Sequence, residues 1–343
     1  MSPDDITAEW LSGVVDAEVA DVASEPIGDG LVGMNLRVRI SGGSDAPSSV
    51  VIKLPSLDPT SRATGIGLRN YEREVKFYEQ IADTVDIRVP HCFHGDWDEA
   101  SGEFVLVLED MAPAEQGDQI AGTDVERAAD AVRELAKLHG PRWGDVTLRE
   151  HEWLGRRAGD SDGAELQALY LMVFPGFAAT YRKHLSTEAF ELAEAFGQVV
   201  GDWLDGRGGP ESVTHGDYRL DNLLFATPAG GPAVTAVDWQ TPGQGAPIPD
   251  LSYFCGAGLI PDERRAAERS LVELYGTSIS EYGIDLDADW LWEQYRHAAF
   301  AGVVMAVAAS QLVGGSERSE SLFTVMASRH LQHAIDLDSL AAI

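Results

Sequence analysis

A motif in the second half of the chain reads Val213-Thr-His-Gly-Asp-Tyr-Arg-Leu-Asp-Asn-Leu-Leu-Phe225. Within it Asn222 comes five residues after Asp217, and a second isolated carboxylate, Asp238, follows the next apolar run. His-Gly-Asp alone is also typical of a polar turn. Asp217, Asn222 and Asp238 in this order favour phosphoryl transfer. The first Asp can orient and deprotonate an attacking hydroxyl, while Asn and the second Asp hold Mg²⁺ on nucleotide phosphates.

The composition is that of a globular protein with an extreme acidic charge. Of the 343 residues 44% are hydrophobic and 24% charged, and the formal net charge is −31. A chain of this length suggests two domains or lobes. The negative charge repels phosphate groups, so we expect neither nucleic acid nor an anionic membrane surface as a partner.

Targeting and redox signals are weak. Cys92 and Cys255 are too few for a disulfide framework or a zinc site. Residues 1–15 carry no basic segment followed by an apolar run, and the most apolar stretch, residues 298–309, is shorter than the roughly 20 residues of a membrane span. We therefore expect a cytoplasmic protein.

A glycine-rich segment follows an amphipathic pattern that predicts a helix over residues 3–20. Gly28, Gly30 and Gly33 lie between two expected strands. Glycine has no Cβ, so this turn can approach phosphate groups closely. An ordinary hairpin turn is the alternative explanation of the same pattern.

Lys53 is the charged residue of an apolar strand predicted over residues 49–55. A nucleotide kinase uses such a lysine to hold the α- and β-phosphates, although a solvent-facing lysine on an edge strand is the alternative for the segment alone. A helix predicted over residues 68–81 offers Glu72 and Glu74 as partners for this lysine. We choose Glu74, which precedes the Val-Lys-Phe-Tyr part of the helix, and expect Glu72 to be solvated.

The remaining segments predict a mostly helical second lobe. A strand over residues 103–111 leads into Ala112-Pro113, a link between lobes, and residues 124–139 form an apolar stripe of helical period. Further helices are predicted over these ranges: 262–281, 288–313 and 319–340. We expect His139 to be structural, and Asp250 to cap a helix start and brace the metal loop.

Together these residues resemble the aminoglycoside phosphotransferase and choline kinase-like superfamily, relatives of the protein kinases. The resemblance covers nearly the whole chain and is most specific at residues 215–222 together with Asp238. It implies an α+β, two-lobed, protein-kinase-like fold, with a small β-rich N-lobe at residues 1–111 and a larger helical C-lobe at residues 112–343. ATP, or another nucleoside triphosphate, is then expected in the cleft between the lobes.

The resemblance also implies a set of roles. It makes Asp217 the catalytic base and makes Asn222 and Asp238 the ligands of Mg²⁺. Lys53 becomes the nucleotide anchor, with Glu74 as its helix partner. His215 joins the predicted catalytic set as the residue that orients the loop, and direct catalysis by it is the alternative. Arg219 and Asp221 contact phosphate or substrate, or else are solvated.

Departures from protein kinases indicate the class of acceptor. The loop reads His-Gly-Asp rather than His-Arg-Asp, Trp-Gln follows Asp238, and no Ala-Pro-Glu segment is present. We therefore predict an ATP- and Mg²⁺-dependent phosphotransferase that acts on a hydroxyl of a small molecule, which is aminoglycoside-, choline- or sterol-like. The alternatives are a catalytically silent, kinase-like nucleotide-binding protein and a hydrolase that transfers phosphate to water. The acceptor and the oligomeric state are left open.

Overall fold

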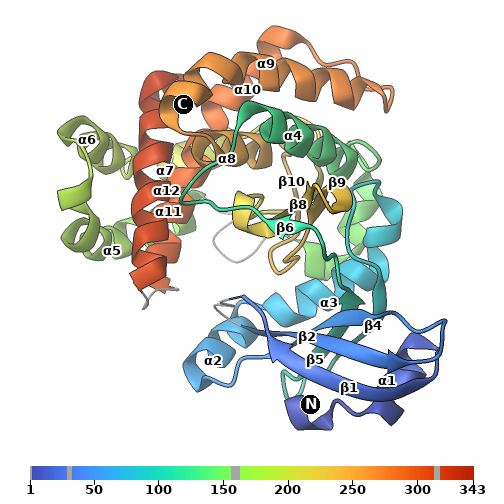
Figure 1. The fold of residues 1–343 in the computed structure, drawn as a ribbon. Helices are drawn as coiled ribbons and strands as arrows, with labels where there is room; N and C mark the ends of the chain where they lie inside the picture. The colour runs from blue at the N-terminus through green and yellow to red at the C-terminus, as the bar shows by residue number, and fades with distance from the viewer. Residues whose placement is uncertain (1, 29–32, 156–162, 313–316) are drawn as a thin grey trace.

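The computed structural model of this chain describes residues 2–28, 33–155, 163–312 and 317–343. It contains a smaller lobe rich in β-structure and a larger helical lobe, joined by the segment that follows strand β5 (Figure 1). The predicted α+β arrangement is therefore confirmed.

The N-terminal lobe is built on a five-stranded antiparallel sheet with the order β1-β2-β3-β5-β4. Its strands are β1 (Val19–Pro26), β2 (Gly33–Gly42), β3 (Ser49–Pro55), β4 (Cys92–Trp97) and β5 (Phe104–Glu109). Its helices are α1 (Ala8–Val15), α2 (Pro59–Gly67) and α3 (Asn70–Gln80), with short 3₁₀ turns at Pro3–Asp5 and Ala82–Thr84. The sheet order places β3, the strand of Lys53, at the centre of the lobe.

The helix predicted over residues 3–20 is wrong at both ends. Thr7 caps α1, whose first turn therefore begins at Ala8. Asp16, with a φ of 49°, ends the helix in a left-handed conformation, and Val19 then begins an edge strand. A short acidic and apolar segment fits a helical period, but the pairing of β1 with β2 decides where that helix stops.

Alternation along β3 determines which way Lys53 points. Val50, Ile52 and Leu54 are fully buried against the core that includes α1, whereas Val51 packs against the core that contains α3. Successive side chains of a strand point to opposite faces of the sheet. Lys53 therefore lies on the face that α3 covers.

The C-terminal lobe packs its helices around one large apolar core, which continues into α3 and β5 of the N-terminal lobe. They are α4 (Val125–His139), α5 (Gly163–Tyr181), α6 (Thr187–Phe196), α7 (Val200–Asp205), α8 (Ile248–Gly258), α9 (Pro261–Ser280), α10 (Ala288–Ala298), α11 (Phe300–Leu312) and α12 (Glu317–Asp336). Short 3₁₀ turns lie at Val146–Glu150, Glu152–Leu154, Arg182–His184, Leu220–Asn222 and Ser339–Ala342. The helix predicted over residues 288–313 is thus two helices that meet at Ala299. Among the described helices, none is both long and apolar enough to cross a membrane.

Two small sheets carry the predicted site loops. Strands β6 (Glu115–Gln116), β8 (Leu223–Thr227) and β9 (Gly230–Ala236) form one sheet, and β7 (Ser212–Thr214) pairs with β10 (Gly243–Gly245) in the other. The loop from β7 to β8 contains Asp217, and the loop from β9 to β10 contains Asp238. Figure 1 shows these strands on the side of the helical lobe that faces the N-terminal lobe.

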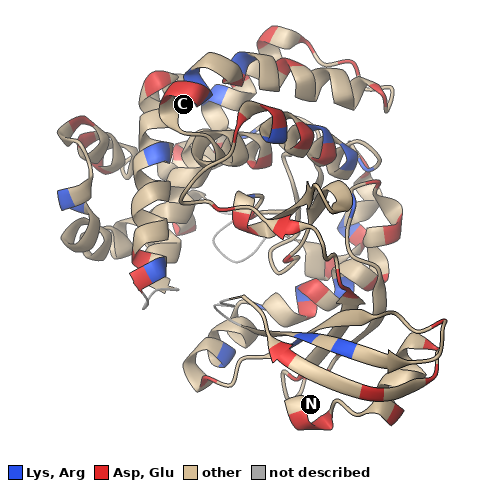
Figure 2. Cartoon of the chain, viewed as in Figure 1, with Lys and Arg blue, Asp and Glu red and all other residues tan. Residues whose placement is uncertain are grey.

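Acidic residues are spread over both lobes rather than gathered into one patch (Figure 2). The net charge of −31 is therefore a property of the whole surface. It marks no single element as a docking site for a cationic partner.

Candidate active site

Lys53 forms two ion pairs at the junction of the lobes. Its Nζ lies 2.5 Å from Oε1 of Glu74 on α3 and 2.9 Å from Oδ1 of Asp238 in the C-terminal lobe. The pairing with Glu74 is the one that the sequence predicted. The contact with Asp238 joins residues 185 positions apart and ties the two lobes together.

Lys53 favours the charged form of both carboxylates of this triad, against the effect of burial. Burial disfavours the charge of Lys53, but the neighbouring Asp238 and Glu74 raise its pKa above the ordinary value. Burial likewise opposes the charge of Asp238, yet Lys53 holds the pKa of that carboxyl below its usual range. Glu74 is fully buried, and this burial raises its pKa against the opposing effect of Lys53.

Glu72 is not solvated, contrary to our expectation. Its side chain is 7% exposed, and it accepts hydrogen bonds from Arg69 at 2.7 Å and from Lys76 at 2.7 Å. Both partners lie on neighbouring turns of the same helix, where residues three and four apart meet. Glu72 is therefore engaged within its own helix and makes no contact with Lys53.

Two further residues of α3 hold the loop that follows Asp238. Phe77 stacks on Trp239 with ring centroids 3.7 Å apart and an angle of 4° between the rings. Arg73 donates to the backbone oxygen of Pro242 at 2.8 Å. Glu74 lies between these two residues, so one helix fixes both the lysine and the loop that carries Asp238.

Asp217 lies at the centre of the second cluster. Its Oδ2 accepts from Nε of Arg219 at 3.2 Å and from Nδ2 of Asn222 at 2.9 Å. Nδ2 of Asn222 also donates to the backbone oxygen of Asp217 at 2.9 Å. The backbone amide of Val237 donates to the backbone oxygen of Asn222 at 3.0 Å, which brings the Asp217 loop next to the Asp238 loop.

Arg219 and Asp221 are not solvated loop residues either. Their side chains are 14% and 10% exposed, and they form an ion pair with each other. Burial opposes the charge of Arg219, but the neighbouring Asp217 raises the pKa of this guanidinium further above its ordinary value. The second oxygen of Asp221 accepts from the backbone amide of Gln119 at 2.9 Å. Asp221 thereby links the Arg219 side chain to the segment that follows β6.

His215 orients the loop that carries Asp217 through both ring nitrogens. Nδ1 accepts from the backbone amide of Asp217 at 3.3 Å, and Nε2 lies 3.1 Å from the backbone oxygen of Val237. With Nδ1 accepting from Asp217, Nε2 is the nitrogen that donates to Val237. Neither nitrogen is left to take a proton from a substrate, so the geometry favours the orienting role over direct catalysis.

The glycine of His-Gly-Asp is required by local geometry. Gly216 has a φ of 76°, which favours glycine, and a Cβ at this position would lie 2.4 Å from the backbone oxygen of Thr241. The close approach lets the hydroxyl of Thr241 donate to the backbone oxygen of His215 at 2.9 Å.

Asp250 braces the loop that carries Asp217, whereas we expected it to brace the predicted metal loop. Its two oxygens accept from the backbone amides of His215 at 2.7 Å and of Gly216 at 3.0 Å. It lies in the first turn of α8 after the N-cap residue Pro247, and it is not the cap. His139 is fully buried beneath it, with Nδ1 2.8 Å from the hydroxyl of Tyr275, in agreement with a structural role.

Tyr253 is a site residue that the sequence did not reveal. Its hydroxyl donates to Oδ1 of Asp217 at 2.8 Å. A signal was available, because Tyr253 follows Asp250 by three residues on α8. Residues with this spacing lie on one face of a helix, and Asp250 was already expected to face a site loop.

One of the predicted glycines begins the strand that pairs with the strand of Lys53. Gly33 pairs with Pro55 and Asn35 pairs with Lys53, so the start of β2 lies next to Lys53 in the sheet. Gly28 has a φ of 67°, and a Cβ on it would meet nothing within 4 Å. Gly30 lies outside the described residues.

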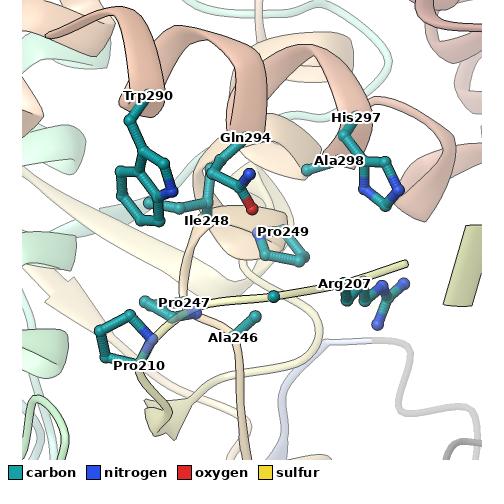
Figure 3. Close-up of a pocket in the computed structure, with 11 residues that line it drawn as sticks. Arg207, Pro210, Ala246, Pro247, Ile248, Pro249, Trp290, Gln294, His297 and Ala298 are labelled. Carbon is teal, nitrogen blue, oxygen red and sulfur yellow. The ribbon is translucent and has the colours of Figure 1, made fainter. Parts of the chain in front are cut away.

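A small pocket of the helical lobe shares no lining residue with these clusters. Figure 3 shows Trp290, Gln294 and His297 projecting from α10 towards Pro247 and Pro249. Its volume of about 10 Å³ admits roughly one water molecule. This pocket is too small to hold an organic substrate.

Comparison with known proteins gives a family match over most of the chain. A model of the phosphotransferase enzyme family matches residues 40–313 of the chain. Among curated proteins, a stretch of 75 residues is 31% identical to acyl-CoA dehydrogenase family member 10 of Mus musculus. That stretch covers 21% of this chain and 7% of the mouse protein, so the chain spans only a small part of this relative's length.

Solved structures match along nearly the whole chain. A candidate aminoglycoside phosphotransferase from Ralstonia eutropha JMP134 is 17% identical, with a TM-score of 0.59 and coverage of 96% of this chain and 97% of that one. A spectinomycin phosphotransferase in complex with ADP and spectinomycin is 12% identical, with a TM-score of 0.50 and coverage of 97% of both chains. A choline kinase from Streptococcus pneumoniae is 12% identical, with a TM-score of 0.51 and coverage of 94% and 96%. At these identities the likeness shows the shared two-lobed, kinase-like fold.

Proposed function

Because this chain belongs to the phosphotransferase enzyme family, we propose that it transfers the terminal phosphate of ATP, or of another nucleoside triphosphate, to a hydroxyl group of a small molecule. The contact that carries the proposal joins the two lobes. Lys53 of the N-terminal sheet lies 2.9 Å from Asp238 of the C-terminal lobe. A cation and a carboxylate that face each other here suit a bound metal–nucleotide complex, because one holds phosphate oxygens and the other holds the metal.

The nucleotide binds between an N-lobe of residues 1–111 and a C-lobe of residues 112–343. Lys53 keeps its positive charge in the wild-type site and contacts the α- and β-phosphates, while Glu74 fixes the direction of its side chain. The turn that contains Gly28, Gly30 and Gly33 covers the phosphates. The solved relative that contains ADP supports a nucleotide in this fold.

The residues at the junction fit a magnesium ion. Nδ2 of Asn222 uses both protons on Asp217, so its Oδ1 is the atom that faces a cation. The side chain of Asp238 is 37% exposed although it pairs with Lys53. Within the described ranges, no group of three His, Cys, Asp or Glu side chains forms a metal site. Mg²⁺ is commonly held by one or two carboxylates together with substrate phosphates and water, which suits this pair.

The charge around the junction also favours a cation. The acidic side chains of the two clusters outnumber the basic ones: Glu74, Asp217, Asp221 and Asp238 against Lys53 and Arg219. Asn222 and Asp238 would hold Mg²⁺, which would neutralise charge on the phosphates.

Asp217 acts on the acceptor. The acceptor hydroxyl donates a hydrogen bond to this carboxylate, which aligns its oxygen with the terminal phosphorus. A bond forms from the hydroxyl oxygen to phosphorus, and the bond from phosphorus to the departing nucleoside diphosphate breaks. The hydroxyl proton passes to Asp217, whose side chain is 20% exposed and thus open to a substrate.

The test is transfer to a panel of hydroxyl compounds, assayed by mass spectrometry with Mg·ATP and Mg·GTP. Solved relatives named for spectinomycin and choline place aminoglycosides and choline-like amines in the panel, next to sugars and sterols. The Asp217→Asn variant should lose about 10²- to 10⁴-fold in rate, the contribution of a general base, and should still bind the nucleotide.

Three results would contradict the proposal. Nucleotide binding without transfer across the panel would favour a silent nucleotide-binding protein. Loss of ATP without a phosphorylated organic product would favour a hydrolase. An Asp217→Asn variant with the wild-type rate would remove this residue from the mechanism.

A further inference from the structure

The hydrogen bonds of Asp217 distinguish its two oxygens. Oδ2 accepts from Arg219 at 3.2 Å and from Asn222 at 2.9 Å. Oδ1 accepts from the hydroxyl of Tyr253 at 2.8 Å. A carboxylate oxygen offers about two acceptor positions. Among the described residues, Oδ2 is therefore saturated and Oδ1 retains one position for a further donor.

Tyr253 belongs to the helix that also holds the backbone of the catalytic loop. Asp250, one turn earlier on α8, accepts from the amides of His215 and Gly216. One helix face thus fixes both the loop and the carboxylate orientation. Tyr253 is 5% exposed, so its hydroxyl is held in place by the surrounding protein.

His330 of α12 holds the ring of Tyr253. The two rings are nearly parallel, with an angle of 6° and centroids 5.1 Å apart. Two glycines make room for His330, because a Cβ on Gly302 would lie 2.1 Å from its ring and a Cβ on Gly256 would lie 2.8 Å from its Nδ1. Helices α8, α11 and α12 together therefore confine the ring pair behind Asp217.

We propose that Tyr253 is a positioning residue that presents Oδ1 of Asp217 to the acceptor hydroxyl. This inference rests on the proposed phosphoryl transfer and adds the atom that receives the acceptor. Tyr253, Arg219 and Asn222 together fix the plane of the carboxylate. Without the phenolic hydroxyl, Oδ1 loses its donor among the described residues, and only the two contacts at Oδ2 are left to fix the plane of the carboxylate.

Tyr253 does not itself take the proton. Burial, and after it the negative charge of Asp217, raises the pKa of this phenol well above its ordinary value. Its hydroxyl therefore stays protonated and continues to donate to Oδ1. The proton of the acceptor goes to Asp217, and the role of Tyr253 is geometric.

The test compares Tyr253→Phe with Tyr170→Phe. The first variant removes the hydroxyl and keeps the ring that stacks on His330. The control loses a comparable buried hydrogen bond, from Tyr170 to the backbone oxygen of Ala193 at 2.9 Å, on helices away from the site. The measurements are kcat, KM for both substrates, the ratio of ADP to phosphorylated product, and the unfolding temperature.

Tyr253→Phe should lower kcat by about 10- to 100-fold, which is the scale of a small misplacement of a reacting group. Its KM for the nucleotide should stay within about twofold of the wild type, because the phosphate contacts are unchanged. The ratio of ADP to product should rise, since water competes better with a misaligned acceptor. Tyr170→Phe should match the wild type in all three quantities.

The outcomes separate this inference from the proposed function. An active wild type together with an unchanged kcat and product ratio in Tyr253→Phe would overturn only the inference. A change confined to the nucleotide KM, or a Tyr253→Phe chain that does not fold, would also overturn it. A wild type that transfers phosphate to no hydroxyl compound would overturn both.

Discussion

Replacing Lys53 with methionine leaves the carboxyl group of Glu74 buried without its ion-pair partner. Glu74 is 0% exposed, and its Oε1 lies 2.5 Å from Nζ of Lys53. Methionine fills a similar volume, so little cavity is created. The dominant effect is electrostatic, because a buried charge that loses its partner is costly.

The loss of unfolding free energy in Lys53→Met depends on the protonation of Glu74. Burial already raises the pKa of this carboxyl above its ordinary value of 4.5, and loss of Lys53 raises it further. Keeping the proton in the folded state costs about 1.36 kcal/mol for each pH unit above the ordinary value. Removing one partner of a buried ion pair costs about 3–5 kcal/mol, so the Lys53→Met chain should be less stable than the wild type by an amount of this order at pH 7 and by less at pH 5.5.

The sign of the pH dependence is fixed by linkage. A carboxyl whose folded-state pKa lies above its unfolded value binds more protons when folded, so the free energy of unfolding falls as pH rises. The free energy of unfolding falls over the pH range from 4.5, the ordinary pKa of a glutamate, up to the raised pKa of Glu74 in the variant. In the wild type, Lys53 opposes the rise in this pKa, so the dependence of the variant is the steeper one.

Urea unfolding followed by tryptophan fluorescence and circular dichroism at pH 5.5, 6.3 and 7 measures these values. Lys76→Met is the matched control, because Lys76 also pairs with a glutamate of α3, at 2.7 Å. Glu72 keeps Arg69 as a partner at 2.7 Å, so the control should lose less than about 1 kcal/mol at every pH. If Lys53→Met lost the same free energy at pH 5.5 and at pH 7, the account of Glu74 as a buried carboxyl that takes up a proton would be refuted.

Two further substitutions test the packing behind the site. Phe77→Ala removes the ring stacked 3.7 Å from Trp239. The free energy of unfolding in urea should fall by about 3–5 kcal/mol, and the KM for Mg·ATP should rise because Asp238 loses its support. An unchanged KM would contradict the link between α3 and this loop. Gly302→Ala places a Cβ 2.1 Å from the ring of His330 and should lower the free energy of unfolding by about 1–3 kcal/mol. In Gly13→Ala on α1, the new Cβ meets nothing within 4 Å, so this variant should gain about 0.5–1 kcal/mol of stability. Equal unfolding temperatures for the two alanine variants would contradict this difference.

Local patterns in the sequence predicted most of the elements that carry the site. The strand of Lys53 and the helices over residues 68–81 and 124–139 match β3, α3 and α4 within about two residues. The period of apolar residues reports directly on backbone geometry, which explains this success. The spacing of Asp217, Asn222 and Asp238 also identified both loops, because each loop follows a short strand.

Patterns of the same kind failed where a neighbour in space decides the outcome. The helix predicted over residues 3–20 stops at Val15 because the next segment pairs with β2. The helix predicted over residues 288–313 is two helices, and no proline marks the junction at Ala299. The helical pattern places Glu72 at a position expected to be solvated, and only the packing of the folded chain shows that it is buried.

The sequence by itself predicted the reaction class, because the candidate catalytic groups lie in short segments whose order and spacing are fixed by the chain. It named Glu74 as the partner of Lys53 for the same reason. Only the tertiary structure decided that Lys53 also contacts Asp238, 185 residues away, and that Tyr253 reaches Oδ1 of Asp217. A hydrogen bond depends on a few tenths of an ångström between side chains, and packing of whole helices and lobes sets that distance.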